Sequence, residues 1–206
     1  MNTLDNAILR SSPASPFGRK VRMAAAVLGL SDRIRLDNAD TMDPTDTVRQ
    51  QNPLGKIPVL VLGNGQCLFD SKVIVEWLAA QVPGNTWFAG GALAQAKVRT
   101  DLHLCDGVTD AALLLVYEGR YREPHQASPK WQTHQAEKIE RALAHLSSHL
   151  PVPDVTQSPA AIALVCALGY LDFRKPVAWR EAHPALVRWF DQAQASHPCV
   201  AETAPA

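Results

Sequence analysis

The sequence predicts an α/β domain followed by an all-α domain, and three observations lead to this fold class. Strand-like and helix-like patterns alternate through the first 80 residues in the order β-α-β-(α)-β-β-α. A stretch rich in Pro and Gly, "VPGNTWFAGG" at residues 82–91, then interrupts the pattern. After it the strand signals disappear and only helical periodicity remains. We therefore place an α/β domain at residues 1–81, a linker at 82–92 and an all-helical domain at 93–206.

The first half of the α/β domain is predicted to run strand, helix, strand. Residues 7–10 form a short apolar run that is typical of a strand. In residues 16–29 the apolar positions recur at helical spacing, and Gly29 stands where the C-terminal cap of a helix is expected. Residues 33–38, "RIRLDN", alternate charged and apolar side chains, which is the spacing of a strand.

The second half of this domain is predicted to contain a hairpin and a helix. Residues 45–51 lie in a polar segment that holds at most one short helix. "IPVLVL" at 57–62 predicts a strand, "GNG" predicts the hairpin turn, and "QCLF" predicts the returning strand. The run "DSKVIVEWLAAQ" predicts a helix whose N-cap is Asp70 or Ser71.

The part of the chain after the linker is predicted to form helices only. Helical spacing of apolar residues predicts two long helices and two shorter ones. Their ranges are 92–121, 130–150, 159–172 and 184–196. The segment "PVPDVTQSP" separates the second of these helices from the third.

Composition and charge exclude several classes of function. Lysine plus arginine and aspartate plus glutamate number 20 each, so the formal net charge is zero. Proteins that bind nucleic acid usually carry a basic stripe, and the longest basic patch here is "GRKVR". Every apolar run is interrupted before it reaches the length that spans a membrane. His145 and His149 are one helical turn apart but have no third ligand nearby in sequence, so no metal site is expected.

The cysteines and the N-terminal residues indicate the cellular compartment of the protein. The four cysteines, none of them in a C-x-x-C pair, are Cys67, Cys105, Cys166 and Cys199. Their spacing predicts no disulfide framework. The stretch "MNTLDNAILR" lacks a basic region followed by an apolar run, so we expect no signal peptide. The resulting expectation is a cytoplasmic protein with reduced thiols.

Three strings of the sequence carry a resemblance to a known family. They are "SPFGRKVRMAA", "NPLGKIPVLVL" with "FDS" after the hairpin, and "ALVCALGYLDFR" in the helical half. The chain resembles the cytosolic glutathione transferases over about residues 7–200, and the third string resembles a bacterial subset of them. The resemblance implies a thioredoxin-like domain that binds glutathione as co-substrate, a helical domain that supplies the pocket of a small electrophile, and a homodimer. It also implies a role in detoxification and a reaction that needs no metal.

Ser15 is the candidate catalytic residue. A thiol with a pKa of about 8.5 is a weak nucleophile at neutral pH, so an enzyme that uses one needs a donor that stabilises the thiolate. Ser15 precedes Pro16 at a strand-to-helix junction, where a plain N-cap is the simpler interpretation of the local sequence. A hydroxyl can accept from the helix and still donate to sulfur. The resemblance matches Ser15 to the "S-P-F" serine of the tau-like and zeta-like serine-type branches.

Two other serines compete with Ser15 for this role. Ser11 and Ser12 stand at the end of the first strand, where turn formation ahead of Pro13 is the simpler explanation of both. The cysteine-type branch of the family carries a cysteine at or near this junction. No cysteine precedes Cys67 here, which argues against that branch.

The resemblance also implies where glutathione is held. Asp70 matches the acidic residue that takes the γ-glutamyl ammonium, and Ser71 matches the hydroxyl that takes its carboxylate. Both residues are also ordinary helix caps. A cis bond between Ile57 and Pro58 is implied, which turns the Ile57 backbone toward the cysteinyl unit. Lys56 matches a residue that often reaches the glycine carboxylate, and a solvated loop lysine is an equal alternative.

The pocket for the second substrate has weaker signals. Phe17, Tyr117, Arg120 and Tyr121 are the candidate lining residues, and ordinary packing is the alternative for each of them. The family usually has a capping box at the start of the buried helix of the second domain. Here Ser158 is present, but Ala161 stands where the carboxylate belongs.

The sequence thus predicts a glutathione transferase that activates the thiol of glutathione for attack on an electrophile. Glutathione-dependent peroxidase, isomerase or dehalogenase chemistry at the same site is an alternative. A non-catalytic binding protein of the same fold is the alternative from another class, and the intact "FDS" and "KIPVL" strings argue against it.

Overall fold

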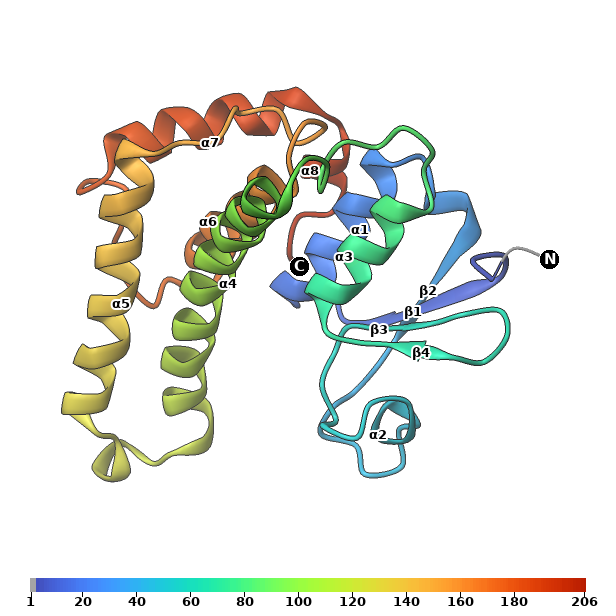
Figure 1. Cartoon of the computed structure of the whole chain (residues 1–206). Helices are drawn as coiled ribbons and strands as arrows, with labels where there is room; N and C mark the ends of the chain where they lie inside the picture. Colours follow the sequence, from blue (N-terminus) through green and yellow to red (C-terminus); the bar gives the residue numbers. More distant parts are fainter. Residues whose placement is uncertain (1–2) are drawn as a thin grey trace. The chain divides into compact units, whose positions relative to one another are not determined.

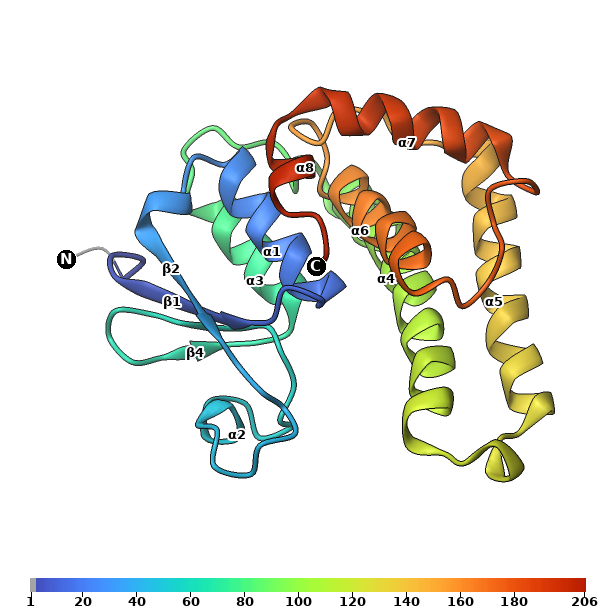
Figure 2. The same cartoon turned by 180° about the vertical axis from the view of Figure 1, so that it is seen from behind.

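The computed structural model describes residues 3–206 of the chain. The chain divides into two compact units (Figures 1 and 2). One unit runs to Gly90 and also includes Cys199–Ala206, and the other is Gly91–Pro198. The sequence predicts a helical domain from residue 93 to the end of the chain, whereas residues 199–206 group with the α/β unit. These residues pack against α1 of that unit, a long-range contact that no local periodicity encodes.

The first unit is built on a mixed four-stranded sheet in the order β2-β1-β3-β4. The strands are β1 (Ala7–Ser11), β2 (Ile34–Asn38), β3 (Val59–Val61) and β4 (Cys67–Leu68). β1 pairs in parallel with β2 and antiparallel with β3, and β3 pairs antiparallel with β4. The parallel pair requires a crossover helix, and α1 supplies it.

Two longer helices and several short ones complete this unit. They are α1 (Pro16–Val27), the 3₁₀ turn Ser31–Arg33, α2 (Val48–Gln51), α3 (Ser71–Ala80) and α8 (Cys199–Glu202). Figures 1 and 2 show α1 and α3 side by side on one face of the sheet and α2 on the other side. The largest fully buried side chains of the unit are Leu4, Leu9, Lys20, Met23, Leu60, Ile74 and Leu78. All but Lys20 are apolar, as expected of a core.

The second unit consists of helices. They are α4 (Ala92–Tyr121), the 3₁₀ turn Pro124–Gln126, α5 (Pro129–Ser148), α6 (Pro159–Arg174) and α7 (Pro184–Ser196). α4 packs against α5 and α6, and α7 packs against α5 and α6. Every residue from Pro159 to Leu171 is buried, so α6 is apolar on all sides, which is typical of a central helix. None of the helices within residues 3–206 combines the length and the apolar character that a membrane span needs.

The predicted elements are present, with differences at their ends. The strand expected at 57–62 covers only Val59–Val61, because Pro58 has no N–H to donate to the ladder. The first helix ends at Val27, and Gly29 follows with a φ of +68°, the left-handed conformation that glycine adopts readily. No local pattern predicted α8, which is only one turn long.

Candidate functional site

Ser15 is the N-cap of α1. Its hydroxyl oxygen accepts a hydrogen bond from the backbone N–H of Gly18 at 3.1 Å, and Pro16 occupies the first helical position. The side chain is partly exposed. The capping role predicted from the local sequence is therefore confirmed. A capping hydroxyl uses its oxygen as acceptor and keeps its hydrogen for a second partner, and the positive end of the helix macrodipole lies at the same place.

Ser11 and Ser12 lie in a different environment. Ser11 is the last residue of β1 and is only 6% exposed. Its hydroxyl donates to the carbonyl of Ser12 at 3.4 Å. It also lies directly against Gly18, where an added Cβ would overlap the Ser11 hydroxyl oxygen. The Ser11 side chain thus packs the end of β1 against the first turn of α1. Ser12, the next residue, is partly exposed.

Asp70 and Ser71 form the start of α3. The Asp70 carboxylate is exposed, and it accepts from the backbone N–H of Lys72 at 2.9 Å and from the Ser71 hydroxyl at 3.0 Å. Ser71 itself is buried. Partial desolvation opposes ionisation of Asp70. The two hydrogen bonds, together with the charges of Lys72 and Lys20, outweigh it and hold the pKa of Asp70 below its ordinary value.

Lys20 also belongs to this region and was not predicted from the sequence. It lies on α1, its side chain is 1% exposed, and its Nζ is 5.8 Å from the centre of the Phe17 ring. Its positive charge favours the ionised form of Asp70. A signal existed in the sequence, because Lys20 stands three residues after Phe17 and four before Ala24, within the apolar stripe of the helix.

Lys56, Ile57 and Pro58 form the approach to β3. The Ile57–Pro58 peptide bond is cis, which confirms the expectation drawn from the resemblance. Ile57 packs against a small apolar cluster of Ala39, Val48 and Val59. The Lys56 side chain is exposed, while its backbone carbonyl accepts from the buried side chain of Asn52 at 2.9 Å. Asn52 begins the string "NPLGKIPVLVL", but its only local signal is that of an Asn-Pro turn, so its role was not predicted.

The candidate residues for the second substrate come from both units. Phe17 is partly exposed on α1 of the first unit. Tyr117, Arg120 and Tyr121 share the last turns of α4 in the second unit. The two tyrosine rings meet edge to face with centroids 5.2 Å apart, and the Arg120 guanidinium lies 5.6 Å from the Tyr117 ring. An open hollow of about 570 Å³ at this end of α4 is lined in part by Arg120 and Tyr121.

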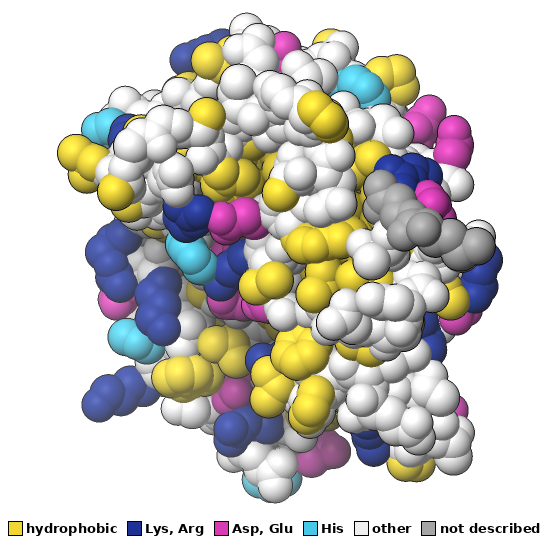
Figure 3. Space-filling view, turned by 45° about the vertical axis from the view of Figure 1, so that its right-hand side comes forward, with side chains coloured by type: hydrophobic (Ala, Val, Ile, Leu, Met, Phe, Trp, Pro, Cys, Tyr) yellow, Lys and Arg dark blue, Asp and Glu magenta, His cyan; other side chains and the backbone are white. Residues whose placement is uncertain are grey.

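Charge and metal-ligating groups complete the description of the candidate site. On the face drawn in Figure 3, basic and acidic side chains are interspersed and form no single field. Within residues 3–206 no cluster of three or more His, Cys, Asp or Glu side chains is arranged to hold a metal ion. The groups described at the starts of α1 and α3 are hydroxyls, a carboxylate and helix N-termini.

Comparison with known proteins gives this geometry a context. Residues 14–81 match the family model described as "Glutathione S-transferase, N-terminal domain". The "Uncharacterized GST-like protein YibF" of Escherichia coli K12 is 35% identical over 184 residues, which cover 87% of this chain and 90% of that protein. The chain belongs to the glutathione S-transferase family.

Solved structures agree with this membership. A glutathione transferase family member from Pseudomonas fluorescens Pf-5, crystallised with bound glutathione, superposes with a TM-score of 0.89 at 37% identity. The match covers 98% of this chain and 100% of that one. A glutathione S-transferase from Methylobacillus flagellatus, also with glutathione bound, gives a TM-score of 0.87 at 34% identity over 98% of this chain and 100% of its own. The predicted fold of this transferase-family chain, a thioredoxin-like α/β domain followed by a helical domain, is confirmed.

Proposed function

We propose that this member of the family is a serine-type glutathione transferase. It binds glutathione on the α/β unit and uses Ser15 to favour the thiolate, which then attacks an electrophilic carbon of a small molecule. The observation that carries this proposal is the Ser15 hydroxyl at the start of α1, with its oxygen already accepting from Gly18 and its hydrogen free to point elsewhere. The relatives crystallised with glutathione support the choice of ligand.

The energy required for thiol activation is within reach of these groups. Lowering a thiol pKa by about two units needs roughly 2.7 kcal/mol of preference for the charged form. A hydrogen bond to a charged acceptor contributes about 1.5–3 kcal/mol. The helix N-terminus adds about 0.3–1 kcal/mol. Ser15 and the positive end of α1 together supply the required amount.

We assign the rest of glutathione to other groups of the α/β unit. Asp70, kept ionised by its environment, binds the γ-glutamyl ammonium. The start of α3 at Ser71 binds the γ-glutamyl carboxylate. The Ile57 backbone pairs with the cysteinyl unit, and Lys56 approaches the glycine carboxylate. The aromatic and cationic group of Tyr117, Arg120 and Tyr121 is assigned to the electrophile, and Phe17 of α1 is assigned to the same role.

The experiment that tests this proposal compares Ser15→Ala with Ser158→Ala. Both serines precede a proline and cap a helix, since Ser158 accepts from the N–H of Ala160 at 3.2 Å. Only Ser15→Ala is expected to raise the pKa of the bound thiol and to slow conjugation of a generic electrophile, by about tenfold to a hundredfold. Titration of the thiolate absorbance of bound glutathione, together with steady-state rates, measures both effects.

Three outcomes separate the alternatives. An unchanged thiol titration in Ser15→Ala, with a shift in Ser11→Ala or Ser12→Ala, moves the role to one of those serines. Binding of glutathione in calorimetry without turnover of any electrophile, peroxide or isomerisable substrate indicates a binding protein. No binding of glutathione at all refutes the proposal. The serine-type class, a homodimer, a cytoplasmic location and a detoxifying role are part of the same proposal.

A further inference from the structure

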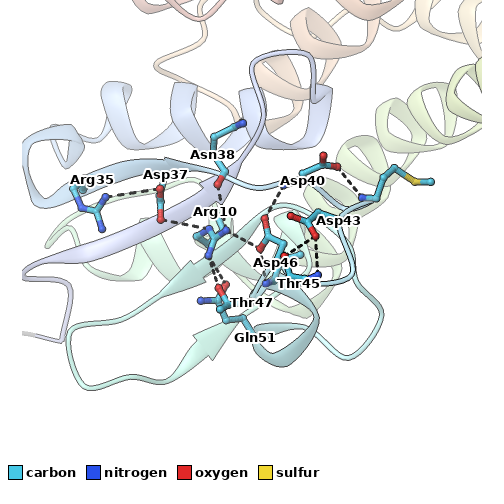
Figure 4. Close-up of polar contacts among 12 residues, drawn as sticks. Arg10, Arg35, Asp37, Asn38, Asp40, Asp43, Thr45, Asp46, Thr47 and Gln51 are labelled. Carbon is cyan, nitrogen blue, oxygen red and sulfur yellow. Dashed lines mark hydrogen bonds and ion pairs between the residues drawn. The ribbon is translucent and has the colours of Figure 1, made fainter.

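Arg10 is a buried cation in the middle of the sheet that the proposed chemistry does not use. It lies on β1, in register with Asp37 of β2 and Val59 of β3, and is 8% exposed. Burying a guanidinium is costly unless it is paired and hydrogen-bonded. Figure 4 shows that its side chain points into the segment that connects β2 to β3.

The guanidinium contacts five residues, two at the end of β2 and three in the connection that follows it. One terminal nitrogen, Nη1, donates to the Thr47 hydroxyl at 2.8 Å and to the Gln51 side-chain oxygen at 3.4 Å. The other, Nη2, donates to the Asp46 carboxylate at 2.8 Å and to the Asn38 carbonyl at 3.2 Å. Nε lies 3.6 Å from the Asp37 carboxylate. Because both terminal nitrogens are engaged with the protein, Arg10 acts on this segment and not on a ligand.

Asp46 extends the contacts of Arg10 along the connection (Figure 4). One carboxylate oxygen accepts from Arg10 and from the backbone N–H of Val48, both at 2.8 Å. The other accepts from the backbone N–H of Asp40 at 2.8 Å. The Asp46 carboxylate therefore links two parts of the connection to the buried Arg10 guanidinium. One part is Asp40, near the start of the connection, and the other is Val48, the first residue of α2.

The connection ends at the proposed glutathione site. Asn52, the residue after α2, is 2% exposed, and its side chain donates to the Lys56 carbonyl at 2.9 Å. Val48 of α2 packs with Val59 and Ile57 in one apolar cluster. A continuous series of contacts thus joins Arg10 through α2 to Lys56 and Ile57.

We propose that Arg10 is a positioning residue for glutathione, which holds Lys56 and the Ile57 backbone in place by ordering residues 38–52. This inference rests on the proposed function, because it assigns Arg10 a role in binding the glycine end of glutathione. It predicts that the binding site loses its preference for a charged glycine carboxylate when Arg10 is replaced, while the activation of the sulfur at Ser15 is retained.

The test compares two ligands, glutathione and its glycine ethyl ester, which differ in the charge of that carboxylate. Calorimetry measures both affinities for the wild type, Lys56→Ala, Arg10→Met and the control Arg33→Met. Arg33 is a matched control, since it belongs to the same unit and binds Asp5 at 2.8 Å at the surface. The wild type and Arg33→Met should prefer glutathione by about tenfold, equal to about 1.4 kcal/mol. In Lys56→Ala and Arg10→Met the preference for glutathione over the ester should fall below about threefold. This corresponds to less than about half of the wild-type difference in binding free energy.

Kinetics give a second readout that general loosening of the fold does not produce. Arg10→Met should raise the KM for glutathione about tenfold and leave kcat at saturating glutathione within about twofold, because the sulfur and Ser15 are unaffected. If Arg10→Met does not fold, Asp46→Asn is used in its place, since it keeps the shape of the side chain and weakens the same contact.

The outcomes distinguish this inference from the proposed function. If Arg10→Met, or Asp46→Asn in its place, weakens both ligands equally, Arg10 is purely structural and the inference is refuted. If the wild type binds both ligands equally, no glycine carboxylate contact exists for Arg10 to organise, although glutathione binding stands. If the wild type binds neither ligand, the proposed function itself fails.

Discussion

Within residues 3–206, three serines precede a proline and cap a helix. The hydroxyl oxygens of Ser15, Ser128 and Ser158 accept from the backbone N–H of Gly18, Trp131 and Ala160, at 3.1, 3.3 and 3.2 Å. A Ser-Pro pair at a helix start is therefore explained by capping and by itself indicates no chemistry. What distinguishes Ser15 is its place, at the junction that leads from β1 into α1 of the thioredoxin-like unit.

The two roles of Ser15 can be separated by the choice of replacement. Ser15→Ala should lower the free energy of unfolding by about 1 kcal/mol, whereas Ser15→Gly should lower it by only a few tenths, because glycine is a tolerable N-cap. Both variants lack the hydroxyl and should lose the same activity. Denaturant unfolding and conjugation rates measure the two effects. If Ser15→Gly instead kept more activity than Ser15→Ala, in parallel with its higher stability, the helix cap and not the hydroxyl hydrogen would determine activity.

Asp70 gives a prediction for pH at the same scale. Its pKa is lowered in the folded protein, so its charge stabilises the fold above the unfolded value of about 3.9 and this contribution is lost as the pH falls below that value. In glutathione binding, the ratio of wild-type to Asp70→Asn affinity should therefore be constant between about pH 5 and 7 and shrink toward one below about pH 4. Calorimetry across this range checks it. A ratio that already falls between pH 7 and 6 would show that another group binds the ammonium.

At the scale of elements, the junction of β1 and α1 depends on one close contact. Gly18 lets the Ser11 side chain lie against the first turn of α1, and a Cβ at residue 18 would overlap that hydroxyl. Gly18→Ala should therefore lower the free energy of unfolding by about 1–3 kcal/mol, the range for overpacking. Ser11→Gly should recover part of this loss in the double variant, since it removes the overlapping atoms. Additive effects in thermal unfolding would mean that the two positions do not interact.

The elements themselves were largely predictable from local patterns. Helical spacing predicted α1 and α3 to α7, and the "GNG" turn predicted the β3–β4 hairpin. The elements that were not predicted are short, such as the one-turn helix α8. A single turn contains too few residues to show a period, and long-range packing decides its conformation.

The candidate site was predictable only in part. The caps at Ser15 and Asp70 follow from residue type and position. The roles of Arg10, Lys20 and Asn52 do not, because each acts through partners that are distant in sequence or through burial. A buried arginine in a strand looks, in the sequence, like an exposed one, since alternation alone does not tell which face is covered.

At the scale of the whole molecule, the chain leaves the α/β unit and later returns to it. The Arg19 guanidinium, 4% exposed on α1, donates to the Val200 carbonyl at 2.8 Å and to the Thr203 hydroxyl at 3.5 Å. Cys199 and Val200 are each 1% exposed. Burial raises the pKa of the Cys199 thiol to about 11, with a further contribution from Glu202, so this cysteine is protonated at neutral pH. The returning segment is thus part of the core of the first unit.

Removal of this segment should therefore weaken the α/β unit. A variant that ends before Cys199 should lose about 3 kcal/mol or more of unfolding free energy, because Val200 is no longer buried and the Arg19 donors lose their acceptors. A variant that lacks only Pro205 and Ala206 is the control. Urea unfolding followed by a probe in the first unit measures the difference. Equal midpoints for the two variants would contradict the role of residues 199–206.

The return of the chain also sets an order of events during synthesis. The strands and helices up to Gly90 leave the ribosome first, but the segment that binds Arg19 follows only after residues 91–198 have been translated. At about 5–20 residues per second this interval lasts on the order of 5–20 s. Throughout it the Arg19 donors lack the Val200 and Thr203 acceptors, so the α/β half of the nascent protein reaches its final form only when translation has passed the helical half.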